Sequence, residues 1–541
     1  MRMRFLSTII TLYLQIKNWV IGEVSISSVY APRQSSSSSS GSGSSGLTIL
    51  KRLKKFYNTN MTDAYTTTII AGGMTVSAGF IVSFYRLSLS PICFNLRSPD
   101  CFNTTGHELG TPPEDHPSNY VDLSTSLSAS MLNFSLNAFM FVGGLYTGYV
   151  MSNHYGRCKA MVVSSVPSIF GWCLLLGYAT TENSALFFGC EALNALSAGL
   201  VIVSALVYLV EVCNRKQYVY TSCCVSLSIL VGFLFGWILH FHVSPTVIYI
   251  HYTGRSVDEK LHDAIQYLPY STLHWVIFAT AGLCIAFANV IATCFLPESP
   301  YWLVQTRSFS AALASLEMLN SVYEDNAKEL EDIKALELSD ESLNVMKSPS
   351  KGCLGTQTNV FLSYVSLILL QQMGGANIVY SLIQPLYEYT YSDKESAVTI
   401  TAYASCVYLL LACALSKMYS HQKYMLCVTL VATVSSMCYS SFLKLSLNKY
   451  NINSYALYII WPHVFSLGLS AAQLLPIIHC IASLKTSYLR SRACFVLLSV
   501  ATFGFYLMSF LRLSVSCYVL VTFFAVSNAS SFVLLVLHPL I

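Results

Sequence analysis

The sequence predicts an all-α membrane protein with twelve transmembrane helices arranged in two halves of six. Hydrophobic residues make up 54% of the chain and charged residues only 10%, whereas a soluble domain carries about 25% charged residues. The apolar residues occur in runs of about 20, the length that crosses the hydrocarbon core of a bilayer. A polar segment near the middle separates six of these runs from the other six. We therefore expect the lipid bilayer to surround this chain.

The start of the chain differs from the rest, and we predict a partly disordered cytoplasmic tail over residues 1–60. The apolar stretch 5–21 contains Gln15 and Lys17, which makes it a poor membrane span. A cleaved signal peptide is the alternative interpretation of this stretch. The serine and glycine tract at 35–46 is typical of flexible, unstructured chain.

The remaining sequence predicts an N-terminal six-helix half at 61–296, linker helices at 297–357 and a C-terminal six-helix half at 358–541. The linker has the pattern of short amphipathic helices on the cytoplasmic side, which Ser310 and Asp325 are placed to cap. The twelve predicted spans cover approximately residues 65–90, 126–151, 160–180, 185–211, 219–242, 272–296, 358–384, 397–416, 424–443, 453–482, 493–511 and 514–537.

Lysine and arginine residues predict the side of the membrane on which each loop lies. With both termini in the cytoplasm, the inner loops hold more than twice as many of these residues as the outer loops, as the positive-inside rule requires. The loop at 94–125 then lies outside the cell, where its sequon makes Asn103 a candidate glycosylation site. We expect a multi-pass protein of the cell membrane. The net charge of +4 reflects this topology and indicates no nucleic-acid partner.

The seventh predicted span contains amide side chains that lipid disfavours. Gln371, Gln372 and Asn377 are costly at this depth unless they bond to one another or face water. Amide groups both donate and accept hydrogen bonds, which suits a neutral ligand rich in hydroxyl groups. The alternative is that they only form hydrogen bonds between helices.

Two short strings carry a resemblance to a known family. Residues 297–303 read PESPYWL, which is similar to the PESPRWL signature of the sugar porter family of the major facilitator superfamily, with tyrosine in place of arginine. Residues 371–377 read QQMGGAN, which resembles the family's QQxxGxN motif. The resemblance covers roughly 60–541, is weaker in the second half, and is closest to insect facilitated sugar and trehalose transporters. It implies that the three amide residues contact a sugar between the two halves.

Three charged residues at the inner ends of the spans match further family motifs. Arg157 belongs to a string that resembles the superfamily's loop motif, Glu211 ends a YxxE motif, and Glu298 belongs to the PESPYWL string. The resemblance implies that these three residues form an ion-pair cluster that holds the inner face closed, and we term them the predicted ion-pair cluster. The alternative is that the positive residues only fix the topology.

The sequence also departs from the family pattern. Glu191 stands where the family has an arginine, and the first predicted span contains no acidic residue. Proton-coupled members use a carboxylate there, because coupling needs a group that titrates as the site switches. We therefore expect transport without proton coupling. His479 in the tenth span is a candidate for the wall of the substrate cavity.

The resemblance implies a facilitative uniporter for a hexose or disaccharide, with the sugar as its small-molecule partner and alternating access as its mechanism. The alternative is a non-transporting relative, a sensor or a silent paralogue, which the eroded second half favours. The sequence lacks the HExxH and GxSxG motifs of enzymes. We therefore predict no enzyme, no catalytic residue, no metal site and no cofactor, and we expect a monomer to be the functional unit.

Overall fold

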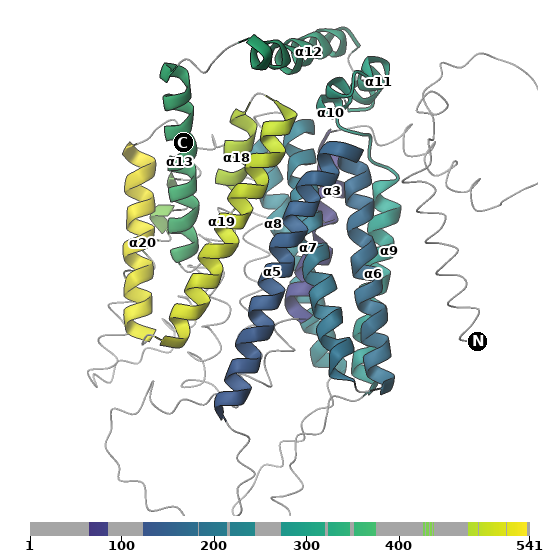
Figure 1. Ribbon diagram of the computed structural model, residues 1–541, viewed down its shortest axis with the longest axis vertical. Helices are drawn as coiled ribbons and strands as arrows, with labels where there is room; N and C mark the ends of the chain where they lie inside the picture. The colour runs from purple at the N-terminus through teal and green to yellow at the C-terminus, as the bar shows by residue number, and fades with distance from the viewer. Residues whose placement is uncertain are drawn as a thin grey trace, which may run out of the picture.

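The computed structural model is helical throughout the part of the chain that it describes (Figure 1), and those residues include no strand. Residue Asn377, the sequon at Asn103 and the predicted tail at 1–60 lie outside the described residues. The described residues are 64–84, 123–181, 183–213, 217–243, 272–319, 323–346, 351–374, scattered positions between 426 and 437, 474–484, 486–514 and 517–537.

The described residues before the linker form six helices, and we call them the N-terminal helices. Among the described residues of the whole chain, six helices are long and apolar enough to cross a membrane, and five of these belong to this group. Such helices are stable in lipid because each satisfies its own backbone hydrogen bonds. The group consists of α3 (Ala64–Gly73, continuing after a turn to Phe84), α5 (Leu123–Tyr155), α6 (Arg157–Thr181), α7 (Ser184–Val212), α8 (Tyr218–Val243) and α9 (Thr272–Thr293).

Helix α7 forms the centre of this group, since it packs against both α5 and α6. Small residues set the distance between α5 and α7. A Cβ atom at Gly144 would lie 2.1 Å from the carbonyl oxygen of Leu196, and one at Gly199 would lie 2.2 Å from the carbonyl oxygen of Phe141. The two backbones therefore touch at glycines, which is the usual way in which membrane helices pack closely.

The described residues of the linker form three shorter helices: α10 (Pro300–Gln305), α11 (Phe309–Leu319) and α12 (Tyr323–Met346). The side chain of Ser299 caps α10 by accepting a hydrogen bond from the backbone N–H of Trp302. The linker has its own small core, built from Trp302, Leu303, Val304, Ala311, Ala312, Leu316, Leu330 and Ile333. It lies across one end of the helix bundle (Figure 1), which we call the linker end.

The expected helical linker is present, but the two predicted caps are wrong. Helix α11 begins at Phe309 and α12 begins at Tyr323, so Ser310 and Asp325 both lie inside the first turns. The sequence pattern places a helix more reliably than its first residue, because the ends of helices fray and short polar side chains fit several positions near them.

The C-terminal helices that the structure describes are α13 (Lys351–Met373), α18 (Leu475–Ser483), α19 (Ser487–Ser514) and α20 (Cys517–Leu537). Helix α13 packs against the other three. Helix α19 also packs against α5 and α7, so it joins the C-terminal to the N-terminal helices. Tyr149 of α5 stacks on Phe495 of α19 with ring centroids 5.9 Å apart, and Ser135 shares a hydrogen bond of 2.9 Å with Tyr506.

Candidate functional site

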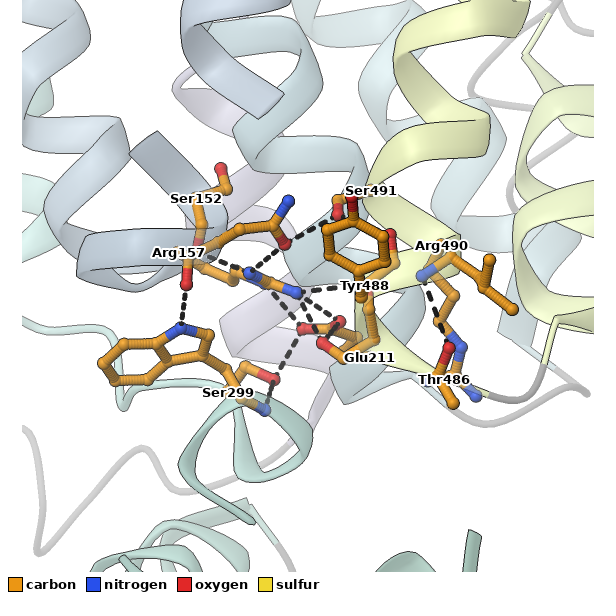
Figure 2. A network of polar contacts seen from close by, with 12 residues as sticks. Ser152, Arg157, Glu211, Ser299, Thr486, Tyr488, Arg490 and Ser491 are labelled. Carbon is orange, nitrogen blue, oxygen red and sulfur yellow. Dashed lines mark hydrogen bonds and ion pairs between the residues drawn. The ribbon is translucent and has the colours of Figure 1, made fainter. Parts of the chain in front are cut away.

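The candidate site at the linker end begins with the turn between α5 and α6. Gly156 occupies this turn with a φ of +100°, which a residue with a side chain rarely adopts. A Cβ atom here would also lie 2.7 Å from the Glu298 Oε2 atom. Glycine therefore allows a sharp turn here, and α6 begins at the next residue, Arg157. The Arg157 side chain is directed toward α7 and α19 (Figure 2).

Arg157 and Glu211 form a buried, two-point ion pair between α6 and α7. The Arg157 Nε atom donates to Glu211 Oε2 at 3.0 Å, and Nη2 donates to Oε1 at 2.9 Å. Both side chains are 0% exposed. The guanidinium also donates to the backbone oxygen of Ser152 and to the Asn153 Oδ1 atom. A planar fork facing a carboxylate in this way gives strong and directional hydrogen bonds.

Two serine hydroxyl groups extend this ion pair to the linker and to the C-terminal helices. Ser299, at the start of the linker, donates to Glu211 Oε2 at 2.6 Å. Ser487, the first residue of α19, donates to Glu211 Oε1 and accepts from Arg157 Nη2. We call Arg157, Glu211, Ser299 and Ser487 the linker-end network, and Figure 2 labels the first three. The network connects the N-terminal helices, the linker and the C-terminal helices, which are far apart in the sequence.

Glu298, the third member of the predicted ion-pair cluster, binds backbone groups. Its carboxylate accepts hydrogen bonds from the backbone N–H groups of Arg157 at 2.8 Å, Cys158 at 3.2 Å and Ser299 at 3.0 Å. Burial raises the pKa of this carboxyl, and these N–H groups oppose that effect. Glu298 therefore sits at the positive end of α6 and ties it to the start of the linker.

Further contacts around the network join α19 to the N-terminal helices. Ser491 donates to the Asn153 Oδ1 atom at 2.7 Å. Tyr149 donates to the hydroxyl of Tyr488 at 2.9 Å. The indole N–H of Trp302 donates to the backbone oxygen of Asn153 at 3.0 Å, which adds a second link from the linker to the end of α5.

Two of the three amide residues of the seventh predicted span, Gln371 and Gln372, lie inside the protein. Gln371 is 3% exposed and Gln372 is 6% exposed, both in the last turn of α13. The Gln371 Nε2 atom is buried and has no hydrogen-bond partner among the described residues. Gly504 of α19 lies against Gln372, since a Cβ atom there would be 2.9 Å from the Gln372 Cβ atom. Both side chains are thus covered by protein.

Two other polar residues named from the sequence also lie within the bundle. The His479 Nδ1 atom of α18 shares a hydrogen bond with the hydroxyl of Tyr364 on α13. Glu191 of α7 is 0% exposed, and its Oε2 atom accepts a hydrogen bond from the side chain of Asn137 on α5 at 3.3 Å. His479 therefore links two C-terminal helices, whereas Glu191 links two N-terminal helices.

Sequence reasoning missed the two serines of the network. Ser299 lies inside the PESPYWL string, so the string itself offered a signal for it. Ser487 lies in the stretch SYLRSR, where nothing in the sequence distinguishes it from other surface serines. A serine hydroxyl can be identified as part of such a network only when the fold places it beside a buried ion pair.

Comparison with known proteins decides which family this arrangement represents. The sequence model described as "Sugar (and other) transporter" matches residues 97–511. The chain belongs to the sugar transporter family. The proteins of this family are transporters and not enzymes, and they have the major facilitator fold. The predicted fold class, twelve helices in two six-helix halves, is thereby confirmed. The narrower placement near insect trehalose transporters stays a prediction.

Curated relatives of this sugar transporter family member are distant. It is 22% identical to the sugar transporter ERD6-like 6 of Arabidopsis thaliana over 51% of this chain and 50% of the relative. It is 26% identical to the sugar transporter ERD6-like 18 of the same plant, over 51% of this chain and 49% of the relative. The facilitated glucose transporter member 8 of Bos taurus is 21% identical over 46% and 42%. The chain spans about half the length of the curated relatives it matches.

Solved structures agree on the fold over nearly the whole chain. The proton:xylose symporter XylE bound to 6-bromo-6-deoxy-D-glucose gives a TM-score of 0.67 at 13% identity, covering 88% of this chain and 96% of that chain. XylE of E. coli in an inward-open conformation gives a TM-score of 0.53 at 13% identity, covering 88% and 96%.

Proposed function

We propose that this protein carries a hexose or a disaccharide across the cell membrane as a facilitative uniporter that works by alternating access. The observation that carries this proposal is the linker-end network. It joins the N-terminal helices, the linker and the C-terminal helices through one buried ion pair and two hydroxyl groups. Hydrogen bonds of this kind can be exchanged for water when the halves rock apart.

The network supports a state in which the linker end is closed. Arg157 and Glu211 hold α6 to α7, and Ser487 brings α19 onto the same pair. The charge pattern of the loops favours the cytoplasmic side for the linker end and for both termini. Opening the network would then release substrate into the cytoplasm.

The amide groups of α13 support a polyhydroxyl ligand. A buried N–H donor without a partner costs about 1–3 kcal/mol, and Gln371 Nε2 is such a group among the described residues. A sugar hydroxyl that accepts from Gln371 would remove this cost. We propose Gln371 and Gln372 as substrate-binding residues, together with Asn377, which lies outside the described residues. Arg157, Glu211 and Glu298 are proposed to control the opening of the linker end, and Asn103 is proposed to carry a glycan.

Counterflow in proteoliposomes tests this proposal with labelled glucose, fructose and trehalose. We expect saturable uptake of at least one sugar, equal with and without a proton gradient. The variant Gln371→Ala should lose most of this uptake. The variant Leu362→Ala, on the same helix but 62% exposed, should retain it. Uptake that depends on the proton gradient would show a symporter instead, and no saturable uptake by the folded protein would contradict transport.

A sensor that binds sugar without transporting it is the second candidate. The buried carboxylate of Glu191, held by Asn137, favours it because the resemblance implies an arginine at this place. Thermal stabilisation by a sugar, in a protein that shows no counterflow, would support the sensor.

A further inference from the structure

The linker helix α12 places a buried carboxyl group against α19. Glu337 is 8% exposed, and its Oε1 atom accepts a hydrogen bond from the backbone N–H of Ser487 at 2.8 Å. Ser487 is the first residue of α19, where unpaired N–H groups give a helix a partial positive charge. The linker is therefore attached to a C-terminal helix through a group that can titrate.

The same serine joins the linker-end network by its side chain. While its backbone N–H binds Glu337, its hydroxyl donates to Glu211 and accepts from Arg157. Ser487 thus connects α12, α19 and the ion pair of the N-terminal helices. Because α19 must separate from that ion pair for the linker end to open, any change in how firmly α12 holds Ser487 changes the ease of opening.

Charged groups from three helices act on the Glu337 carboxyl. Glu211 of α7 repels a negative charge there, whereas Arg157 of α6 and Arg490 of α19 attract one. The guanidinium of Arg490 lies 4.3 Å from the centre of the Tyr301 ring of α10, and the residue is 7% exposed. The Glu337 carboxyl therefore lies among charged groups of both signs. Adding or removing one proton there changes the electrostatic energy of the contact between α12 and α19.

The two linker helices that pack on α12 add little charge to this environment. Helix α10 has no charged residue, and the only one in α11 is Glu317, which is exposed. Burial, with repulsion by Glu211 as a smaller cause, raises the pKa of Glu337 from 4.5 to about 7, against the opposing effect of the Ser487 N–H. A group with this pKa changes its charge near neutral pH.

We propose that Glu337 makes the attachment of the linker to α19 depend on cytoplasmic pH, so that protonation tightens the attachment and ionisation loosens it. The sign follows from linkage. The attached carboxyl binds a proton more readily than a released, exposed one, so acid favours attachment and the advantage is lost as pH rises through about 7. Between pH 8 and pH 6, the attachment equilibrium should shift about tenfold toward the attached state.

Hydrogen–deuterium exchange of the full chain in lipid nanodiscs tests this proposal without any sugar. Exchange times at pH 6 and pH 8 are scaled for the intrinsic exchange rate, and peptides from α12 and from the first turn of α19 are followed. Wild-type protein should show about tenfold stronger protection of these peptides at pH 6 than at pH 8. The E337Q variant, which resembles the protonated residue, should show strong protection at both values.

The matched control is Glu331→Gln, which removes a glutamate of the same helix whose side chain is 72% exposed and pairs with Lys334. This variant should keep the pH response of the wild type, because an exposed pair contributes little. Equal protection of the wild type at both pH values, or a pH response that persists in E337Q, would overturn the proposal. The variant Glu337→Ala should lose protection at both values while its transmembrane helices remain protected.

The consequence for flux rests on the proposed transport function, and a separate measurement keeps the two apart. If counterflow occurs, acid on the linker side should slow it in the wild type but not in E337Q. A pH response in exchange together with no counterflow at any pH would contradict transport and leave the pH-dependent attachment in place.

Discussion

At the scale of single residues, the Arg157–Glu211 pair depends on both partners being present. Neither side chain is exposed, so removing one charge leaves the other buried and unpaired. Such a loss costs about 3–5 kcal/mol. We predict that Glu211→Gln lowers the free energy of unfolding by an amount in this range, measured by thermal unfolding in detergent. Glu317→Gln, which changes an exposed glutamate of α11, should leave the unfolding temperature unchanged.

Gly156 gives a second prediction at this scale. Its positive φ and the nearby Glu298 carboxylate leave no room for a side chain. We predict that Gly156→Ala destabilises the protein by about 1–2 kcal/mol through backbone strain. Gly73→Ala is the control, because its Cβ atom would meet nothing within 4 Å and alanine is favoured in a helix. Comparable losses in the two variants, compared by thermal unfolding, would contradict the strain argument.

The residues of the site show where sequence reasoning succeeds and where it stops. Residue types that lipid excludes, such as Arg157 and Gln371, stand out because burying them needs a reason. The partner of each group is less visible. The family resemblance implied Glu298 as a third member of the ion-pair cluster, and the structure shows its carboxylate accepting hydrogen bonds from the backbone of α6. Backbone N–H groups carry no sequence signal, so this contact could not be predicted.

At the scale of the helices, hydrophobic length predicted most of the described spans closely. The span expected at 185–211 is α7 at Ser184–Val212, and the one at 160–180 is α6 at Arg157–Thr181. The eleventh span, expected at 493–511, begins earlier as α19 at Ser487. Its first turns include Arg490 and Arg492, which the predicted span left out. The helix continues through them because Arg490 stacks on Tyr301 of the linker.

The close approach of α5 and α7 supports a prediction about neighbouring glycines. A Cβ atom at Gly144 would lie 2.1 Å from the backbone of α7, whereas one at Gly143 would meet only the end of the Leu196 side chain at 3.7 Å. Gly144→Ala should therefore push the helices apart and cost about 1–3 kcal/mol. Gly143→Ala should be nearly neutral. The order of the two unfolding temperatures checks this, and the reverse order would be incompatible with the observed packing.

At the scale of the whole molecule, the contact between the N-terminal and C-terminal helices combines aromatic packing with polar groups. Along α5 and α19, Tyr149 stacks on Phe495 and binds Tyr488. At the linker end, Ser487 adds hydrogen bonds to a charged pair. Polar junctions of this kind can exchange their hydrogen bonds with water, which the proposed alternating access would require.

Ser487 allows this idea to be tested without disturbing either set of helices. Ser487→Ala removes the hydroxyl contacts to Arg157 and Glu211 but leaves that ion pair intact within the N-terminal helices. Hydrogen bonds to charged groups contribute about 1.5–3 kcal/mol, so the open linker end should become roughly 10- to 100-fold more populated. Hydrogen exchange in the first turns of α6 and α19 should accelerate accordingly. The control is Ser499→Ala, because the Ser499 hydroxyl donates only to the backbone oxygen of Phe495 within the described part of its own helix. This variant should leave exchange at the linker end unchanged. If both variants behave alike, Ser487 does not hold the halves together.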